Sequence, residues 1–422
     1  MKLHHLLLTT FLFISFSFNS HAQFDLLDKV KDKVTDKVNQ KTDEAIDKTL
    51  NGEEEKKNEK EKQTDQKEVK KEETKSPEVT KQKDEDLKAY SKFDFVPGDQ
   101  VIFFEDFSQD NVGDFPGKWN TNGSGEIVTF NNYPGKWLNM KMNGAFYPEL
   151  KNKFPENYTI EYDMIYKVAP TREVGCAMEL DLISTIKDQQ IDALVPGNGG
   201  CAFQTTNFSC STFNWKDGIY GDIKNGKDLT TLTDLNGKPV RISIWVQKQR
   251  VRVYINESKI YDVPRLIPEG LVLDRVRFLE GGEQEGFDMY ISNFRVAFGA
   301  PDTRNKLITE GKFVTTGIHF DSGSDKIKAD SYGTLKEIAG VLKDNPTVKV
   351  KIVGHTDTDG NAKSNLDLSK RRAASIKNSL ANEFGIDASR METDGKGPTQ
   401  PVSDNSTAEG KANNRRVEFI KM

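Results

Sequence analysis

The chain has 422 residues, of which 30% are charged and 35% hydrophobic, and its formal net charge at pH 7 is -5. This length suits two globular domains joined to a linker. The small negative charge creates no basic electrostatic field, so nucleic acid is not an expected partner.

Residues 1–22 have the pattern of a secretory signal. Lys2 precedes an apolar run from residue 6 to residue 18, and a Ser-His-Ala stretch at residues 20–22 supplies small residues at the cleavage positions. The run is too short to span a bilayer, so we predict export, with Gln23 as the first residue of the mature chain. No cysteine follows the run, so we expect no lipid on a new N-terminal cysteine. No later segment is apolar enough to be a transmembrane helix.

Residues 23–50 repeat a four-residue unit in which Asp-Lys-Val recurs three times. Val30, Val34 and Val38 then lie on one slowly drifting face of a predicted amphipathic helix. A period of four drifts by roughly 40° per step, so the pattern does not fit a regular heptad coiled coil. The helix either self-associates or rests on a partner or membrane surface, or it is a charged helix in solvent.

Residues 51–92 are nearly all Glu, Lys, Gln, Asp and Thr. Such a segment cannot bury enough apolar surface to offset the loss of chain entropy on folding. We predict a disordered or transiently helical linker, long enough to tether a domain to the cell wall.

Short alternating runs with many aromatic residues fill residues 93–300. The clearest hairpin pairs Val240–Val246 with Arg250–Ile255, and similar runs recur between Gly, Pro and Asn residues. This pattern predicts an all-β sandwich. The residues around Asp106-Phe107 and Trp119, together with the hairpin, resemble a concanavalin-like or laminin-G-type jelly roll, which implies a glycan or protein ligand.

Two alternatives apply to this region. A membrane β-barrel, porin-like and with a periplasmic anchor, needs at least eight strands of about ten residues, and most of the runs are shorter. A jelly-roll hydrolase with Glu179 and Asp181 at its centre needs a further acid on the same strand, which residues 183–185 do not supply. Glu161 and Asp163 lack a partner in the same way. We therefore predict no enzyme activity, and place both acid pairs on the solvent face of a strand.

Cysteine and histidine give little support for other chemistry. Cys201 and Cys210 either form one disulfide, which leaves Cys176 over, or are buried free thiols. Only His319 and His355 lie beyond the predicted signal, too few for a histidine-rich metal site. We expect no metal and no cofactor.

Residues 301–422 predict an α/β fold of β-α-β-α-β type. Val348, Val350 and Ile352 alternate with lysines, as in a half-buried strand. From Leu368 to Phe384 an apolar face recurs every fourth residue, which predicts a helix. We expect the first helix over Asp330–Leu342 and the last strand over Asn413–Ile420.

Four motifs in this region closely resemble the OmpA-like C-terminal domain, a peptidoglycan-binding module of Gram-negative envelopes. In chain order they are Phe320-Asp321-Ser322 on the first predicted strand, Gly354-His355-Thr356-Asp357, Asn365-x-x-Leu368-Ser369-x-x-Arg372-Ala373, and Asn414-Arg415-Arg416-Val417-Glu418. The resemblance extends from about Gly311 to the C-terminus. It implies a periplasmic or outer-membrane-associated protein that binds peptidoglycan without catalysis.

The resemblance also implies the binding residues. Asp357 and Arg372 hold diaminopimelate of the peptide stem, the carboxylate of Asp357 facing the ligand amine and the guanidinium of Arg372 facing the ligand carboxylate. The further residues of the implied site are Thr356, Asn365, Leu368 and Gly323. Gly323 stands where the family commonly has an asparagine, so the side-chain contact of that asparagine is lost.

Overall fold

The computed structural model describes residues 93–422, apart from short gaps at 142–143, 152, 169–176, 187–194, 207–208, 230–233, 282–286 and 300–302. The described residues fall in one compact unit. The predicted signal (1–22), amphipathic helix (23–50) and linker (51–92), and also Cys176, lie outside the described residues.

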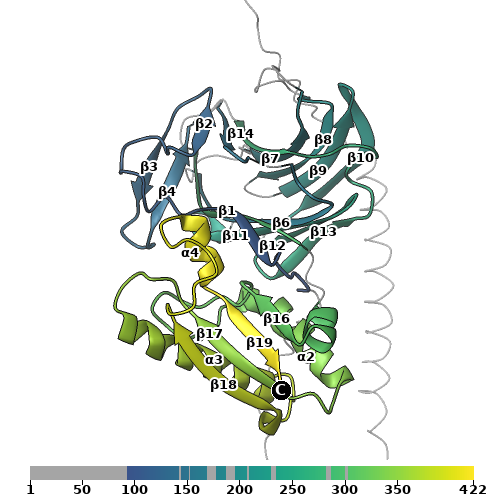
Figure 1. Ribbon diagram of the computed structural model, residues 1–422. Coiled ribbons are helices and arrows are strands. Elements are labelled where there is room, and N and C mark those ends of the chain that lie inside the picture. Colours follow the sequence, from purple (N-terminus) through teal and green to yellow (C-terminus); the bar gives the residue numbers. More distant parts are fainter. Residues whose placement is uncertain are drawn as a thin grey trace, which may run out of the picture. The chain divides into compact units, whose positions relative to one another are not determined.

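The middle region is β-rich, as predicted, and its described strands form two antiparallel sheets (Figure 1). In the first sheet the strand order is β13-β12-β11-β6-β15-β4-β3, with β1 also paired to β15. In the second sheet the order is β10-β9-β8-β7-β14-β5-β2. The strands are β1 Gln100–Glu105, β2 Trp119–Thr121, β3 Gly125–Thr129, β4 Lys136–Met140, β5 Ala145–Pro148, β6 Asn157–Val168, β7 Ala177–Ser184, β8 Gly199–Thr206, β9 Ser209–Lys216, β10 Ile219–Asp228, β11 Val240–Gln247, β12 Arg250–Ile255, β13 Ser258–Val263, β14 Arg275–Gly281 and β15 Phe287–Phe298.

Both sheets contribute to one hydrophobic core. Val240, Ile242 and Ile244 lie on one face of β11 and are fully buried, as strand alternation requires. The ring of Tyr162 from β6 meets the ring of Phe278 from β14 edge-on, with centroids 5.2 Å apart. Because these two strands belong to different sheets, we refer to residues 93–298 as the β-sandwich.

Both acid pairs were predicted on a solvent face, which was wrong for Glu161 and Asp181, because both are buried; Asp163 and Glu179 are half-buried. Asp181 and Arg277 are both fully buried and form an ion pair, with Asp181 Oδ2 2.6 Å from Arg277 Nη2. Glu161 is also buried and lies between Arg241 and Arg295. The alternation pattern could not reveal this, because the partner arginines lie on strands distant in sequence.

Cys201 and Cys210 are buried free thiols, in β8 and β9. Of the two alternatives for this pair, the structure therefore supports the thiols and not the disulfide. Burial raises the pKa of Cys210, and it raises the pKa of Cys201 still further. Both groups are accordingly poor nucleophiles.

Glu280 is a buried carboxyl group in the sandwich, and burial, then Asp288, raise its pKa to about 8. Its ordinary value is 4.5. Between these two values the folded state binds more protons than the unfolded state, so this group makes stability fall as pH rises through that window. A pKa shift of this size can lower the free energy of unfolding by about 4 kcal/mol across the window, and we expect Glu280→Gln to remove that loss. Urea unfolding at pH 5 and pH 8.5 measures it. Equal pH dependence in Glu280→Gln and in the exposed control Glu269→Gln would contradict the expectation.

The C-terminal region is an α/β domain with a four-stranded sheet of order β16-β19-β17-β18. Strand β17 pairs with β18 in parallel and with β19 antiparallel. The elements are the π-helical turn η3 Asn305–Thr309, β16 Lys312–Thr315, the 3-10 turn η4 Ala329–Ser331, α2 Tyr332–Asp344, β17 Val350–His355, α3 Ala362–Asn382, the 3-10 turn η5 Ala388–Arg390, β18 Met391–Gly397, α4 Ala408–Asn414 and β19 Val417–Lys421.

The predicted β-α-β-α-β order lacks one strand, β18, and two further details of it were wrong. The first strand is β16, and Phe320 lies after it, in a tight turn that makes a single bridge to Ile327. Asn413 and Asn414 belong to α4 and not to the last strand. Thr407 caps α4 by accepting a hydrogen bond from the backbone N–H of Gly410, and a seven-residue helix containing Gly and two Asn leaves little periodic signal.

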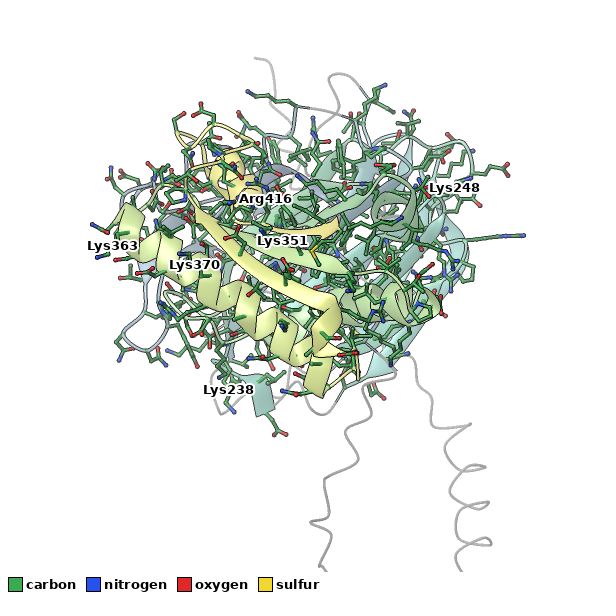
Figure 2. All side chains as sticks on the ribbon, turned by 60° about the horizontal axis from the view of Figure 1, so that its bottom comes forward. Lys238, Lys248, Lys351, Lys363, Lys370 and Arg416 are labelled. Carbon is green, nitrogen blue, oxygen red and sulfur yellow. The ribbon has the colours of Figure 1, made fainter. Side chains whose placement is uncertain are left out.

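Helix α3 packs directly on the backbone of the sheet. A Cβ atom at Gly354 would lie 2.4 Å from the carbonyl oxygen of Ser369, so only glycine allows this approach. Lys363 and Lys370 are exposed on α3 (Figure 2). This packing holds α3 against the end of β17, where the predicted binding residues lie. Among the helices of the described part, none has the length and apolar character to cross a membrane.

Candidate functional site

The loop after β17 is held by its own hydrogen bonds. Thr356 Oγ1 donates to the carbonyl oxygen of Asp357 at 2.8 Å, and Asp357 Oδ1 accepts from the backbone N–H of Asp359 at 3.1 Å. The amide of Asn365 donates to the carbonyl oxygen of Asp359 at 2.8 Å. Thr356 and Asn365 therefore shape the loop that presents Asp357.

Asp357 forms an ion pair with Arg415, whose Nη1 lies 2.6 Å from Asp357 Oδ2. The side chain of Asp357 is 11% exposed and that of Arg415 is 38% exposed. Arg415 follows α4 directly and extends over the ring of Phe104 from the sandwich, 5.5 Å from its centroid. We therefore expect much of the ion-pair attraction to be screened by solvent.

Arg372 is half-buried on α3. Its Nε donates to the carbonyl oxygen of Ser324 at 2.9 Å, and its guanidinium lies 4.7 Å from the ring centroid of Phe320. Burial, then the neighbouring positive charge of Arg415, lower the pKa of Arg372. Since an arginine keeps its charge at any physiological pH, Arg372 and Arg415 place two positive charges at one cavity.

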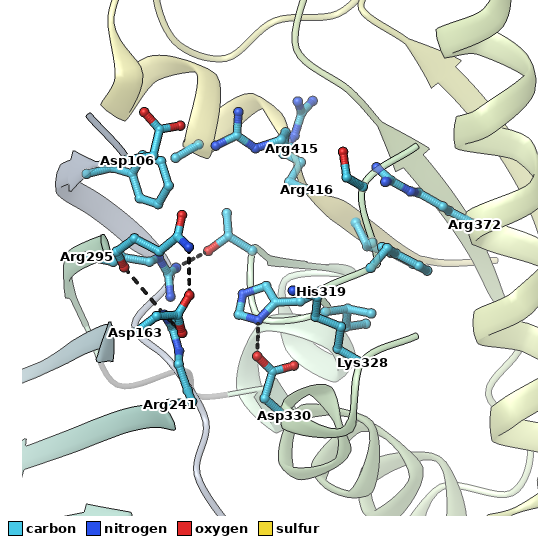
Figure 3. Close-up of a pocket in the computed structure, with 18 of the residues that line it drawn as sticks. Asp106, Asp163, Arg241, Arg295, His319, Lys328, Asp330, Arg372, Arg415 and Arg416 are labelled. Atoms are coloured by element: carbon cyan, nitrogen blue, oxygen red, sulfur yellow. Dashed lines mark hydrogen bonds and ion pairs between the residues drawn. The ribbon is translucent and has the colours of Figure 1, made fainter. Parts of the chain in front are cut away.

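Arg372 and Arg415 line a cavity of about 540 Å³ (Figure 3). Its floor holds His319, whose ring Nδ1 is 2.8 Å from Asp330 Oδ2. Burial alone would raise the pKa of Asp330, but its contact with His319, and then the charge of Arg241, hold that pKa well below its usual value. The C-terminal domain thus contributes a predominantly cationic wall.

The sandwich supplies the other wall of the same cavity. Arg241 donates to Glu161 Oε2 at 3.0 Å and to Asp163 Oδ1 at 3.1 Å. Arg295 pairs with Glu161 and donates to Thr316 Oγ1 of the C-terminal domain at 2.5 Å. These charges satisfy one another, so they build the wall and are not free for a ligand.

The remaining predicted residues lie at different depths. Leu368 is half-buried on α3. Gly323 has φ +65°, and a Cβ atom added there would meet no atom within 4 Å, which fits a turn without side-chain contact. Arg415 was not among the predicted site residues, although it stands in the quoted Asn-Arg-Arg motif. Among the described residues, no group of three or more His, Cys, Asp or Glu could hold a metal ion.

The Glu179–Asp181 pair lies outside this cavity, on β7. Burial, then the carboxylate of Asp181, raise the pKa of Glu179, while Arg277 faces Asp181. Gln204 donates to Glu179 Oε2 at 3.4 Å. The arrangement is that of a buried ion pair beside a carboxyl group whose pKa is raised.

Comparison with known proteins identifies the C-terminal region. The model of the OmpA family matches residues 319–415. The probable lipoprotein YiaD of Escherichia coli is 46% identical over 102 residues, which cover 24% of this chain and 46% of that protein. Outer membrane porin F of Pseudomonas aeruginosa is 41% identical over 105 residues, which cover 25% of this chain and 30% of that protein. The chain thus spans less than half the length of these two relatives.

Among solved structures, the peptidoglycan-associated lipoprotein of Burkholderia pseudomallei is 25% identical, with 29% of this chain and 98% of that chain covered and a TM-score of 0.25. The cell wall anchor of the type VI secretion system of Pseudomonas aeruginosa is 27% identical, with 28% and 92% covered and a TM-score of 0.24.

Proposed function

From the premise that residues 319–415 form an OmpA family domain, we propose that the protein binds peptidoglycan non-covalently through residues 301–422 and performs no catalysis. In this role the β-sandwich is tethered to the cell wall or outer membrane. The sandwich then binds a glycan or protein ligand of its own, and residues 23–50 mediate self-association. An outer membrane porin and a probable lipoprotein are among the relatives, which confirms the prediction of an exported envelope protein.

The observation that carries this proposal is the pair of guanidinium groups of Arg372 and Arg415 at one cavity, with Asp357 beside them. Asp357 pairs with Arg415, and Arg372 forms no ion pair among the described residues, so the two cations leave a net positive charge in a partly desolvated place. A ligand carboxylate relieves the repulsion between them, and a guanidinium can donate two parallel hydrogen bonds to it.

Asp357 suits the amine of the same ligand. Each of its oxygens accepts one hydrogen bond within the protein, from Arg415 and from Asp359. A carboxylate oxygen has two lone pairs, so each retains one acceptor site for a ligand N–H. Arg372 and Asp357 together fit the free amino-acid head of diaminopimelate in a peptidoglycan stem peptide.

The ligand itself offers the sharpest test. Lysine differs from diaminopimelate by lacking the carboxylate beside the side-chain amine, so a stem peptide with lysine gives Arg372 no anion. We expect the whole protein to bind the diaminopimelate peptide at least about tenfold more tightly in isothermal titration, as a charge-assisted bidentate contact implies. Equal affinity for the two peptides, or binding of neither, would contradict the proposed function.

A further inference from the structure

The β-sandwich is fastened to the C-terminal domain on one side of the cavity by α4. The side-chain amide of Asn413 bonds both backbone groups of Val101, accepting from its N–H at 3.1 Å and donating to its carbonyl oxygen at 2.9 Å. Next to this contact, Lys118 Nζ lies 3.1 Å from Glu409 Oε1. Strand β1 is thereby held with its end, Phe104 to Asp106, at the cavity.

A second contact involves the start of the sandwich and helix α2. Tyr332 of α2 packs against a small cluster formed by Phe93, Phe95 and Tyr254. A Cβ atom at Gly333 would lie 2.0 Å from the carbonyl oxygen of Phe95, so backbone meets backbone there without space for a methyl group. Two separate contacts fix the sandwich wall relative to Arg372.

The charged side chains of the sandwich wall differ in whether they already form ion pairs. Arg241, Arg295 and Asp163 are used in ion pairs. Asp106 lines the cavity and is half-buried, and it makes no ion pair among the described residues; its Oδ1 accepts only the backbone N–H of Ser108 at 3.0 Å. Figure 3 shows Asp106 on the side of the cavity where Arg415 lies, across from Arg372.

We propose that the β-sandwich is part of the peptide-binding site, with Asp106 as a second carboxylate for the ammonium group of a ligand whose carboxylate lies at Arg372. This inference rests on the proposed function and extends it. Asp357 is not among the described residues that line the cavity, and each of its oxygens has one acceptor site left beside its hydrogen bond within the protein. An ammonium group has three N–H donors, so one that binds Asp357 can also bind Asp106, a half-buried carboxylate of the cavity without an ion pair among the described residues. Glu257 also lines the cavity but is exposed. The site then selects stem peptides whose diaminopimelate amine is free, not acylated by a cross-link.

The first test disturbs the docking of the sandwich. Gly333→Ala adds one methyl group to α2, where alanine favours the helix but collides with Phe95. Gly340→Ala makes the same change in the same helix at a position with open space. We expect Gly333→Ala to weaken binding of the diaminopimelate peptide by about tenfold in isothermal titration of the whole protein, and Gly340→Ala to bind as wild type.

The second test addresses the ammonium. Titration uses the diaminopimelate peptide with its side-chain amine either free or acetylated, and compares Asp106→Asn with Asp217→Asn. Asp217 is an exposed residue with φ +51° in the turn between β9 and β10, where asparagine is equally suited. A partly exposed ion pair is worth up to about 1 kcal/mol, so we expect Asp106→Asn to lose about fivefold affinity for the free amine only.

The outcomes separate the two proposals. Wild-type affinity in both Gly333→Ala and Asp106→Asn, with binding still lost in Arg372→Ala, would overturn the role of the sandwich and leave the proposed function standing. Wild-type protein that does not distinguish the diaminopimelate from the lysine peptide would instead overturn the proposed function. Loss of the free-amine preference in Asp106→Asn alone supports the inference even if Gly333→Ala lowers stability.

Discussion

Replacing Arg277 by methionine is expected to destabilise the β-sandwich by about 3–5 kcal/mol. Arg277 and Asp181 are both 0% exposed, and the guanidinium Nε donates to Asp181 Oδ2 at 2.7 Å. Without Arg277, the carboxylate of Asp181 would remain in the protein interior with no cation, beside the carboxyl group of Glu179. A loss of this size is a large part of the free energy of unfolding of a typical domain, so a fraction of the molecules should be unfolded at physiological temperature. Thermal and urea unfolding measure the effect.

Two variants serve as controls for the buried pair. Arg275→Met changes the same strand two residues earlier, where the half-exposed guanidinium lies 5.5 Å from the ring centroid of Tyr147, and should cost at most about 1 kcal/mol. Removing both charges, in Arg277→Met with Asp181→Leu, should recover most of the stability, because the penalty comes from the unpaired charge. A double variant as unstable as Arg277→Met would show that packing, not charge, causes the loss.

Arg372→Ala is expected to weaken binding of a diaminopimelate stem peptide by at least about tenfold, and by up to about 2–5 kcal/mol if the contact is fully desolvated. The carboxylate of the ligand would then face the cavity without its bidentate partner. Arg372→Lys should restore little, because an ammonium group cannot donate two parallel hydrogen bonds to a carboxylate. Arg371→Ala is the matched control: its side chain is exposed and points about 100° away around the helix.

Asp357→Ala is a less direct test than Arg372→Ala. It removes the ion pair with Arg415 and the acceptor of the Asp359 backbone N–H, so the loop after β17 loses support as well as a ligand contact. Binding and melting temperature should both fall in this variant. Arg372 donates its hydrogen bond to a carbonyl oxygen of a turn. In Arg372→Ala the loss of binding free energy should therefore exceed the loss in the free energy of unfolding.

Local patterns predicted the elements that carry the site. The alternation of Val348, Val350 and Ile352 predicted β17, and the four-residue apolar period predicted α3, because each element has one face on the core. Strand β18, Met391–Gly397, was not predicted, since its three charged residues alternate with Met, Thr and two Gly, which give little apolar signal. Its position follows from parallel pairing with β17, which is a property of the sheet and not of the segment.

The surroundings of the site could not be predicted from any single segment. The pairing of Asp357 with Arg415 joins residues 58 positions apart, and Asp106 follows a strand whose contact with α4 joins residues 312 positions apart. The burial of Glu161 and Asp181 likewise depends on arginines from other strands. Sequence motifs identified the ligand-binding domain, whereas tertiary contacts determine which charges face the ligand.

The most direct test of peptidoglycan binding combines ligand and protein changes in one cycle. Wild-type protein and Arg372→Ala are each titrated with the diaminopimelate peptide and the lysine peptide, after melting curves show that both proteins are folded. Contact between Arg372 and the extra carboxylate predicts that wild type prefers the diaminopimelate peptide at least about tenfold, and that Arg372→Ala binds the two peptides equally weakly. A folded Arg372→Ala protein that keeps the full preference would contradict this account.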